Sequence, residues 1–241
     1  MNVIWLDSID STNSEALRRL ADVPSGTVIA AREQTAGRGQ RGNTWFTQPG
    51  QNLTFSIVLK FEDVFPAALA VKLNYLSSLA VAEFLRSYGV ACQIKWPNDV
   101  YVGKRKICGI LVENQLGTYG LASSVIGIGI NINQKEFPQL ANATSLSIHT
   151  SQEYDVEACL QQFLNCFEER LPQVFDAGSG LLDAYASELF RKGVRARYYD
   201  VLQEEEFEGV IQGVEPDGRL CIEDTAGKSR YYHFKEVSYI L

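Results

Sequence analysis

Histidine is scarce in this chain of 241 residues, which contains only His149 and His233. A histidine-rich metal site and a Ser-His-Asp hydrolase are therefore both disfavoured. The five cysteines form no C-x-x-C pair, and their odd number favours reduced thiols in a reducing compartment. We therefore expect the chemistry to depend on lysine, arginine, aspartate and backbone groups, with no metal site made by side chains.

Basic residues are also fewer than acidic ones: the chain has 22 lysines and arginines and 29 aspartates and glutamates, which gives a net charge of −7. A nucleic-acid binder that works through bulk electrostatics usually has a basic balance, so no DNA partner is expected. The apolar runs are shorter than the roughly 20 residues that a membrane span needs. The first residues lack the basic segment and long apolar run of a signal peptide. We therefore expect a cytoplasmic protein with no membrane partner.

The segment 34–51 stands out for its composition. It carries four glycines, two arginines and one tryptophan, and no acidic residue occurs between Glu33 and Glu62. Glycine lets the backbone approach a ligand closely and turn its N–H groups toward an anion, and arginine adds forked donors for carboxylate or phosphate. Its pattern G-R-G-x-R-G lacks the G-K-[ST] of a P-loop. The segment is therefore interpreted as a loop that grips an anion.

The order of apolar patterns predicts an α+β protein. Strand pairs linked by tight turns and flanked by helices indicate a mixed or antiparallel central sheet, not a doubly wound one. After Gly193 the chain changes to closely spaced short strands, which suggests a small SH3-like β-barrel. We expect a larger domain in residues 1–190 and the barrel in residues 191–241. One expected helix starts near Asn13, and three others span 67–88, 155–176 and 180–190. The expected strands of the larger domain are 2–7, 27–31, 52–59, 93–96, 99–102, 105–113 and 121–131.

Several short motifs outside the loop offer polar or basic groups. Ser11, Thr12 and Asn13 precede an apolar helical pattern, where they serve as caps or bind a neutral polar ligand group. Lys95 and Lys106 lie where apolar strands begin or end, so their side chains can point into a cleft. The neighbouring Lys104 and Arg105 fit a solvated hairpin turn.

Glycines inside apolar strands form another motif. Gly109 suggests a close backbone approach. The glycines of segment 126–133 alternate with isoleucines, which either clears room for a flat ligand or lets a helix pack closely on the sheet. The spacing does not choose between these two readings.

Taken together and in order, the motifs resemble those of the biotin protein ligases, over nearly the whole chain. They are D-S-T-N at 10–13, G-R-G-x-R-G at 37–42, K-W-P-N-D at 95–99, R-K-x-x-G-I-L-V-E at 105–113 and G-I-G-I-N-I-N at 127–133. The resemblance implies a catalytic domain of the class II aminoacyl-tRNA synthetase and biotin synthetase type. It also implies that biotin is activated by ATP and Mg²⁺ as biotinyl-5′-AMP. The acyl group then passes to a lysine of a biotin carboxyl carrier protein.

The resemblance further implies roles for individual residues. Arg38 and Lys106 would offset the repulsion between the biotin carboxylate and the α-phosphate. Asp99 would orient or deprotonate the incoming lysine, and Lys95 would assist at the phosphate or acyl oxygen. The implied biotin-binding residues are Ser11, Thr12, Asn13, Gln34, Gly37, Arg38, Gly39, Gln40, Lys106, Gly109, Leu111, Gly127 and Gly129. The implied ATP-binding residues are Arg38, Arg41, Trp45, Lys95, Asn98, Lys106 and Asn131.

The chain departs from the family pattern in two places. Many members have arginine where Gln40 stands, so a second guanidinium contact to the intermediate is in doubt. The chain also starts just before the first expected catalytic strand, which leaves no room for the DNA-binding domain that some members carry, so a monofunctional ligase is expected. The competing hypotheses are a lipoate or octanoyl protein ligase, a non-catalytic biotin sensor, and an RNA-binding protein that uses the barrel. Family relatives include monomers and homodimers, and both states stay open.

Overall fold

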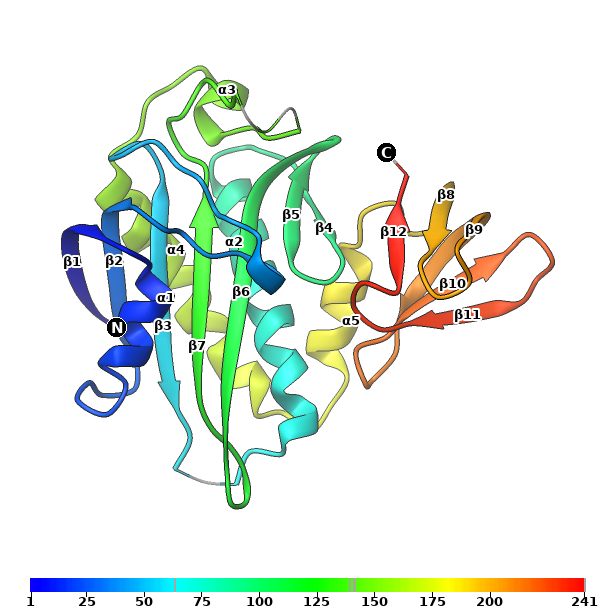
Figure 1. The fold of residues 1–241 in the computed structure, drawn as a ribbon, viewed down its shortest axis with the longest axis horizontal. Coiled ribbons are helices and arrows are strands. Elements are labelled where there is room, and N and C mark those ends of the chain that lie inside the picture. Colours follow the sequence, from blue (N-terminus) through cyan, green and yellow to red (C-terminus); the bar gives the residue numbers. More distant parts are fainter. Residues whose placement is uncertain (63, 139, 141, 241) are drawn as a thin grey trace.

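The computed structural model describes the chain except residues 63, 139, 141 and 241, and it describes only the backbone of Arg41. Within the described residues, seven strands form a central sheet, and five further strands form a second sheet beside it (Figure 1). The strands of the central sheet are, in spatial order, β1 (Asn2–Ile9), β2 (Thr27–Gln34), β3 (Leu53–Lys60), β7 (Gly120–Ile130), β6 (Arg105–Gly117), β5 (Asp99–Val102) and β4 (Gln93–Lys95).

The central sheet is mixed, as the sequence predicts. Strands β1 and β2 pair in parallel, and the other neighbouring pairs that the structure describes are antiparallel. A parallel pair needs a crossover connection, and helix α1 (Thr12–Arg18) supplies it between β1 and β2. The long hairpin of β6 and β7 places Gly109 opposite Gly129 and Leu111 opposite Gly127. This register collects the motif glycines on two adjoining strands.

The two faces of the central sheet carry different cores, because successive residues of a strand point to opposite sides. Phe55 of β3 belongs to the large core and lies with its ring 5.1 Å from that of Phe163 in helix α4. Val58 of the same strand joins Ala16 of α1 in a small core on the other face. The helices of the large-core side are α2 (Val71–Ser87), α4 (Val156–Arg170) and α5 (Gly180–Ser187), with 3₁₀ turns at Ala67–Ala70 and Leu171–Val174; the short α3 (Leu146–Thr150) lies at one end (Figure 1).

The segment Ala67–Ser87 is long and apolar enough to cross a membrane, although no apolar run in the sequence predicted a span. However, 61% of its most apolar stretch is buried inside the fold. Leu76, Leu79 and Phe84 are buried in the large core, which also contains α4 residues. The apolar character of this helix is therefore explained by packing against the sheet and α4.

The C-terminal strands are all antiparallel where the structure describes their pairing. Their order is β11-β10-β9-β8-β12, with no pairing described between β11 and β12, so the sheet is open and does not close into the expected barrel. The outer strands are short, and β12 pairs with β8 through three residues. The bounds are β8 (Arg195–Asp200), β9 (Glu205–Val214), β10 (Leu220–Asp224), β11 (Ser229–Tyr232) and β12 (Val237–Tyr239).

Trp96 fixes the second sheet against the end of the central sheet. Its indole nitrogen donates a hydrogen bond to the Gly218 carbonyl at 3.1 Å, and its ring lies edge-on to Phe234 at 6.3 Å. The backbone N–H of Ile94 also bonds to the carbonyl of Glu188 at 2.8 Å, just before the second sheet begins. These contacts bring the C-terminal residues next to strands β4 and β5. The expected division at residue 190 stays a prediction.

Candidate active site

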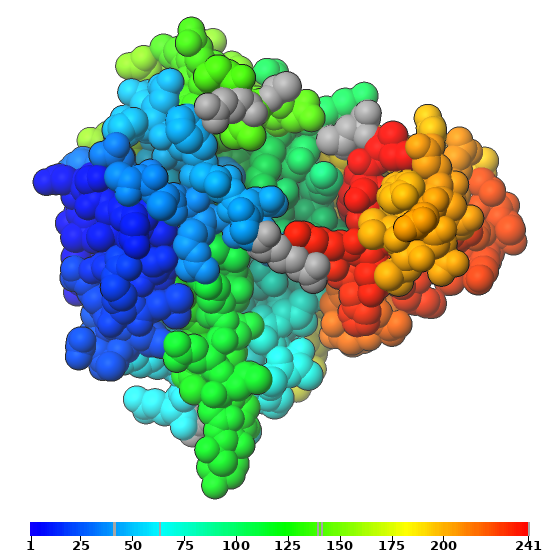
Figure 2. All heavy atoms as spheres, in the orientation of Figure 1, coloured from blue at the N-terminus to red at the C-terminus, as the bar shows by residue number. Residues whose placement is uncertain are grey.

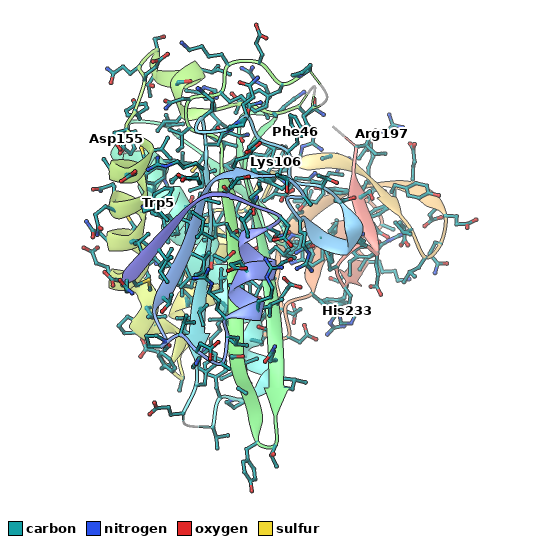
Figure 3. The ribbon with its side chains drawn as sticks, turned by 60° about the vertical axis from the view of Figure 1, so that its left-hand side comes forward. Trp5, Phe46, Lys106, Asp155, Arg197 and His233 are labelled. Carbon is teal, nitrogen blue, oxygen red and sulfur yellow. The ribbon has the colours of Figure 1, made fainter. Side chains whose placement is uncertain are left out.

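A cavity of about 630 Å³ lies between the central sheet, the segment 34–51 and the last strand, β12. In the space-filling view, that segment and the C-terminal residues approach each other across the same face (Figure 2). Lys106, labelled in Figure 3, lies at the start of β6 in the central sheet. The following predicted site residues line the cavity: Ser11, Thr12, Asn13, Gln34, Arg38, Gly39, Gln40, Trp45, Lys95, Asn98, Asp99, Lys106, Gly109, Leu111, Gly127 and Gly129.

Three predicted site residues are placed differently. Gly37 lines a smaller adjoining cavity of about 430 Å³. Asn131 is buried outside the cavity lining, and its amide donates to the Thr144 carbonyl at 2.9 Å. The side chain of Arg41 lies outside the described residues. The implied ligand roles of these three residues stay predictions, as do those of the residues that line the larger cavity.

The start of helix α1 forms a buried polar floor in the cavity. Ser11 is the N-cap, with extended backbone angles, and its hydroxyl accepts from the N–H of Ser14. The backbone N–H and the hydroxyl of Thr12 both donate to Gln34 Oε1, at 2.8 and 3.1 Å. Of the two sequence readings, the capping role is confirmed for Ser11, while Thr12 and Asn13 lie inside the helix; all three residues line the cavity, and ligand binding by them stays a prediction. Each of Ser11, Thr12 and Asn13 is at most 3% exposed.

The amide of Asn13 is held from two sides. Its Oδ1 accepts from the Ser56 hydroxyl at 2.6 Å, and its Nδ2 donates to Glu113 Oε2 at 2.8 Å. A buried amide needs partners for its oxygen and its nitrogen, and these two neighbours fix which end points where. Ser56 is fully buried on β3, and Glu113 lies on β6. The floor thus presents one defined orientation of neutral polar groups.

The glycines of β7 make room for side chains of this chain itself. A Cβ atom at Gly127 would lie 1.9 Å from Asn13 Oδ1, so the close packing of a helix on the sheet explains this glycine. A Cβ atom at Gly129 would lie 2.3 Å from the Trp45 ring, so this glycine accepts a flat group, here an indole. The helix-packing reading is therefore confirmed at Gly127, while Gly129 makes room for an indole of this chain, and room for a flat ligand stays a prediction. Gly109 adds space beneath the same indole, with Trp45 Cζ3 at 3.0 Å from its notional Cβ.

The segment 34–51 folds over the floor as a compact loop. The N–H of Trp45 bonds to the Gly37 carbonyl at 2.9 Å, and the N–H of Gly39 bonds to the Asn43 carbonyl at 2.7 Å. The short 3₁₀ turn Gln40–Gly42 forms its tip. Among the described residues, the buried indole N–H of Trp45 and the buried Oε1 of Gln40 have no hydrogen-bond partner. Buried polar groups are rarely left unpaired, so these two groups mark unused hydrogen-bonding capacity in the loop.

Two cations at the cavity are paired with carboxylates from neighbouring strands. Lys106 Nζ lies 2.6 Å from Asp99 Oδ1 and 5.5 Å from the centre of the Trp45 ring. The Arg38 guanidinium contacts Glu113 with both terminal nitrogens, at 2.7 and 3.1 Å. Each of these cations therefore lines the cavity with a carboxylate already beside it.

Lys95 occupies a more enclosed place between two aromatic rings. Its Nζ lies 5.0 Å from the ring centres of Tyr101 and Tyr239, and it donates to the Tyr101 hydroxyl at 3.4 Å. Burial lowers the pKa of Lys95 below that of an exposed lysine, and the nearby Asp99 opposes part of this shift. Tyr239 belongs to β12, so the second sheet contributes directly to the surroundings of Lys95.

Residues 5–131 match the model of the Biotin/lipoate A/B protein ligase family, which is more than half of the chain. The chain belongs to this family. The bifunctional ligase/repressor BirA of Bacillus spizizenii is 33% identical over 96% of this chain and 72% of its own length. The biotin–[acetyl-CoA-carboxylase] ligase of Paracoccus denitrificans is 30% identical over 91% of this chain and 93% of its own length.

A solved structure of the same fold supports this assignment. The biotin protein ligase of Aquifex aeolicus, in complex with biotin and ATP, is 29% identical to this chain and superimposes with a TM-score of 0.80. The similarity covers 98% of this chain and 97% of that one, so it includes the C-terminal sheet. The fold that this chain shares with that structure therefore extends over both sheets.

The sequence analysis missed several residues that shape the cavity. Ser56 looks like an ordinary position of a buried strand, and its alternation with apolar neighbours gives no sign of a polar task. Glu113 closes a motif that was identified, but its partners could not be foreseen. Ser56 and Glu113 act on the lining from outside it, and the lining residues that were missed are Asn43, Thr44, Trp96, Pro97, Ile110, Ile128, Phe234, Lys235, Val237, Ser238 and Tyr239.

Proposed function

We propose that this protein is an ATP-dependent biotin protein ligase. It activates biotin as biotinyl-5′-AMP and transfers biotin to a lysine of a biotin carboxyl carrier protein. The observation that carries the proposal is the polarity of the cavity, which joins a buried neutral floor to two exchangeable cations, Arg38 and Lys106. Biotin has the same two ends, a neutral ureido ring and a carboxylate. The relatives named as biotin ligases support this reading.

The floor would bind the ureido ring. The groups proposed for this are Ser11, Thr12, Asn13 and Gln34, which are neutral and held by hydrogen bonds inside the protein. A site whose buried polar groups pair with a ligand rejects analogues that leave those groups unpaired. Gly109, Leu111, Gly127 and Gly129 would form the walls around the rings and the acyl chain.

In the first step, a carboxylate oxygen of biotin attacks the α-phosphorus of ATP, and pyrophosphate leaves. Two anions must approach each other, so their repulsion is the main obstacle. We propose that Lys106 leaves Asp99, and Arg38 leaves Glu113, to contact the oxygens between the two reacting groups. Charge accumulates on these oxygens in the transition state, so the cations stabilise it more than they stabilise the bound substrates. Lys95 adds a third positive charge at the phosphate or acyl oxygen.

The nucleotide would lie against the loop. Trp45 already rests on Gly129, and its buried indole N–H has no acceptor among the described residues, so we propose that it packs on adenine and donates to the nucleotide. Asn98 lines the cavity, but its amide donates to the Ile110 carbonyl, which leaves its oxygen for a ligand. Arg41 and Asn131 are kept as proposed ATP contacts from the family resemblance.

Mg²⁺ would enter with the phosphates of ATP. Among the described residues, no group of three or more His, Cys, Asp and Glu side chains could hold a metal ion. Mg²⁺ in nucleotide enzymes is typically bound through substrate phosphates, water and one or two carboxylates, so it does not need a cluster of protein ligands. The ion would screen the negative charge of the phosphates while the residues above hold biotin.

In the second step, the ε-amine of the carrier lysine attacks the acyl carbon of biotinyl-5′-AMP, and AMP leaves. The amine must lose a proton. Asp99 is proposed to accept it, because Lys106 can turn from Asp99 to the departing phosphate. The turn just before Asp99 contains Trp96, which bonds to Gly218 beside the second sheet, so we propose that the carrier approaches there. We further propose that residues 191–241 are a module of SH3-like type, attached to the catalytic domain 1–190.

The transfer reaction tests the proposal directly. The purified protein is incubated with biotin, ATP, Mg²⁺ and a biotin carboxyl carrier domain, and intact mass spectrometry follows the carrier. We expect the mass of one biotinyl group on a single lysine, with one AMP formed for each group. The control is a carrier whose acceptor lysine is replaced by arginine, which should stay unmodified. Modification with lipoate in place of biotin would instead support a lipoate ligase, which the family description also includes.

A further inference from the structure

Glu113 connects two parts of the cavity that have different tasks. Its Oε2 accepts from the Asn13 amide at 2.8 Å and from Arg38 at 3.1 Å, while its Oε1 accepts from Arg38 at 2.7 Å. Asn13 belongs to the buried floor, and Arg38 belongs to the loop above it. A single carboxylate therefore bonds to both the proposed ring-binding site and the proposed anion-binding loop.

The bond to Asn13 defines how its amide is presented. The Ser56 hydroxyl occupies Oδ1, so the Nδ2 end must point to Glu113. The packing of Asn13 on Gly127 removes the space for other positions. A carboxylate accepts only, so it tolerates the NH₂ end of the amide and excludes the flipped form. Glu113 thus contributes to selecting the orientation that a ligand meets.

The bond to Arg38 holds the loop in place. Two parallel N–H···O contacts fix both the distance and the plane of a guanidinium, which a point charge would not do. The side chains of Arg38 and Glu113 are 42% and 26% exposed. Ion pairs with this much solvent contact contribute only about 0–1 kcal/mol to the free energy of unfolding. A gain in stability therefore does not explain this arrangement well.

We propose that Glu113 is a positioning residue for biotin activation. In the empty protein it holds Arg38 and the loop over the floor while it keeps the Asn13 amide turned. When the substrates bind, their anionic oxygens take over Arg38, and Glu113 keeps its bond to Asn13. Because the loop is already ordered, the binding of biotin does not have to supply the free energy of ordering it. Half-saturation is therefore reached at a lower biotin concentration. This inference rests on the proposed function for its biotin part only.

The test compares three variants. Glu113→Gln removes the charge but keeps an oxygen for Asn13, and Glu113→Asp keeps the charge on a shorter side chain. The matched control is Glu83→Gln, which breaks the ion pair of Glu83 with Arg170 away from the cavity. The first readout is the rate at which trypsin cleaves after Arg38 or Arg41 in the ligand-free protein. The second is the pair of KM for biotin and kcat in biotin-dependent exchange of pyrophosphate into ATP.

We expect Glu113→Gln to raise the cleavage rate and the KM for biotin by up to about fivefold each, because an ion pair this exposed contributes about 1 kcal/mol at most. At saturating biotin, kcat should stay within about twofold, since Glu113 touches no reacting atom. Glu113→Asp should recover part of both effects, and Glu83→Gln should change neither. Pre-formed adenylate should protect the loop equally in the unaltered protein and in Glu113→Gln, because the ligand then holds Arg38.

Two results would overturn the inference. If Glu113→Gln behaves like Glu83→Gln in both readouts, Glu113 is an ordinary surface partner. If cleavage accelerates while KM for biotin is unchanged, Glu113 holds the loop but does not position it for biotin. Failure of the proposed function is recognised separately, because the unaltered protein would then show no biotin-dependent exchange. The biotin part of the inference would fall with it, while the cleavage rate would still report on the loop.

Discussion

The floor of the cavity and the loop above it differ in charge, burial and the way their side chains are held. Thr12, Asn13 and Ser56 are buried, neutral and bonded to one another or to fixed neighbours. Arg38 is charged, 42% exposed on its side chain, and paired with the carboxylate of Glu113, which we propose that a substrate anion replaces. A neutral ring is recognised best by groups that do not move, whereas chemistry between two anions needs cations that can change partners. The comparison predicts that changes in the two regions have different kinetic signatures.

The largest effect is expected at the charged side. Lys106→Ala should lower the rate of adenylate formation by about 100- to 1000-fold, because it removes a cation aimed at charge that develops in the transition state. The Lys106 side chain is 31% exposed, so its loss should leave the fold intact. Single-turnover formation of biotinyl-5′-AMP measures the rate, and circular dichroism checks the fold. Lys104→Ala, in the exposed turn, is the control; a comparable loss there, or near-normal activity of Lys106→Ala, would contradict the assignment.

Two neighbouring glycines should separate the floor from the loop. In Gly127→Ala the new methyl group displaces Asn13, so we expect the KM for biotin to rise by about 100-fold through lost hydrogen bonds. In Gly129→Ala the methyl group displaces the Trp45 ring, so the KM for ATP should rise more than the KM for biotin. Both constants come from the pyrophosphate exchange assay. Gly213→Ala, whose added Cβ meets no atom within 4 Å, is the control.

One pattern of results would contradict separate roles for the floor and the loop. If both glycine variants raised the KM for the same substrate by the same factor, the two regions would act as one unit. The two glycines occupy equivalent places on one face of β7, so the chemistry of the change is the same in each. A difference in substrate dependence must therefore come from what each glycine touches.

Retention of the intermediate should depend on the loop. We expect Arg38→Ala to release biotinyl-5′-AMP about tenfold faster, since a guanidinium contact to an anion is lost. Gly39→Ala should act in the same direction, because its methyl group would press on the Asn43 carbonyl at 3.2 Å. Chase of pre-formed labelled adenylate measures release. Arg32→Ala, which breaks an exposed pair with Glu157, should not change it; unaltered retention in Arg38→Ala would refute the role.

The smallest effect is expected from the pH dependence of Lys95. Its pKa is lowered by burial, so folding disfavours the charged form. The unfolded lysine titrates near about 10.4. Between the lowered pKa and that value, the unfolded state binds more protons, so the stability of the unaltered protein should rise with pH relative to Lys95→Met. Urea unfolding between neutral and alkaline pH measures the difference; a gap that stays constant or changes in the other direction would contradict the burial of a charged lysine.

Much of the fold follows from local sequence patterns. The alternation of strand 52–59, the glycines of segment 126–133 and the capping residues at Ser11 are local signals, and each element is found where it was expected. The predicted helix at 155–176 is shorter, because an α-helix ends at Arg170 and a 3₁₀ turn with Pro172 follows. Helix α3, with five residues, was not predicted, since so short a helix carries little periodicity.

The site was predictable only where a motif names the residue. Lys106, Arg38 and Asn13 were found because they lie in motifs, but their pairing with Asp99, Glu113 and Ser56 depends on strand register, which no local pattern contains. The contribution of Tyr239 depends on how the second sheet packs at Trp96. The open edge between β11 and β12 likewise depends on strand pairing, so short strands alone suggested a closed barrel that the structure does not show.

Biotin-dependent exchange of pyrophosphate into ATP is the measurement that tests the account most directly. It requires both regions at once, since the floor must hold the ring while Lys106 and Arg38 bring carboxylate and α-phosphate together. The account predicts that biotin supports exchange. The exchange rate should be strongly reduced in Lys106→Ala at every biotin concentration. In Gly127→Ala it should be reduced at low biotin and largely recover at saturating biotin. Exchange that lipoate supports and biotin does not would contradict it.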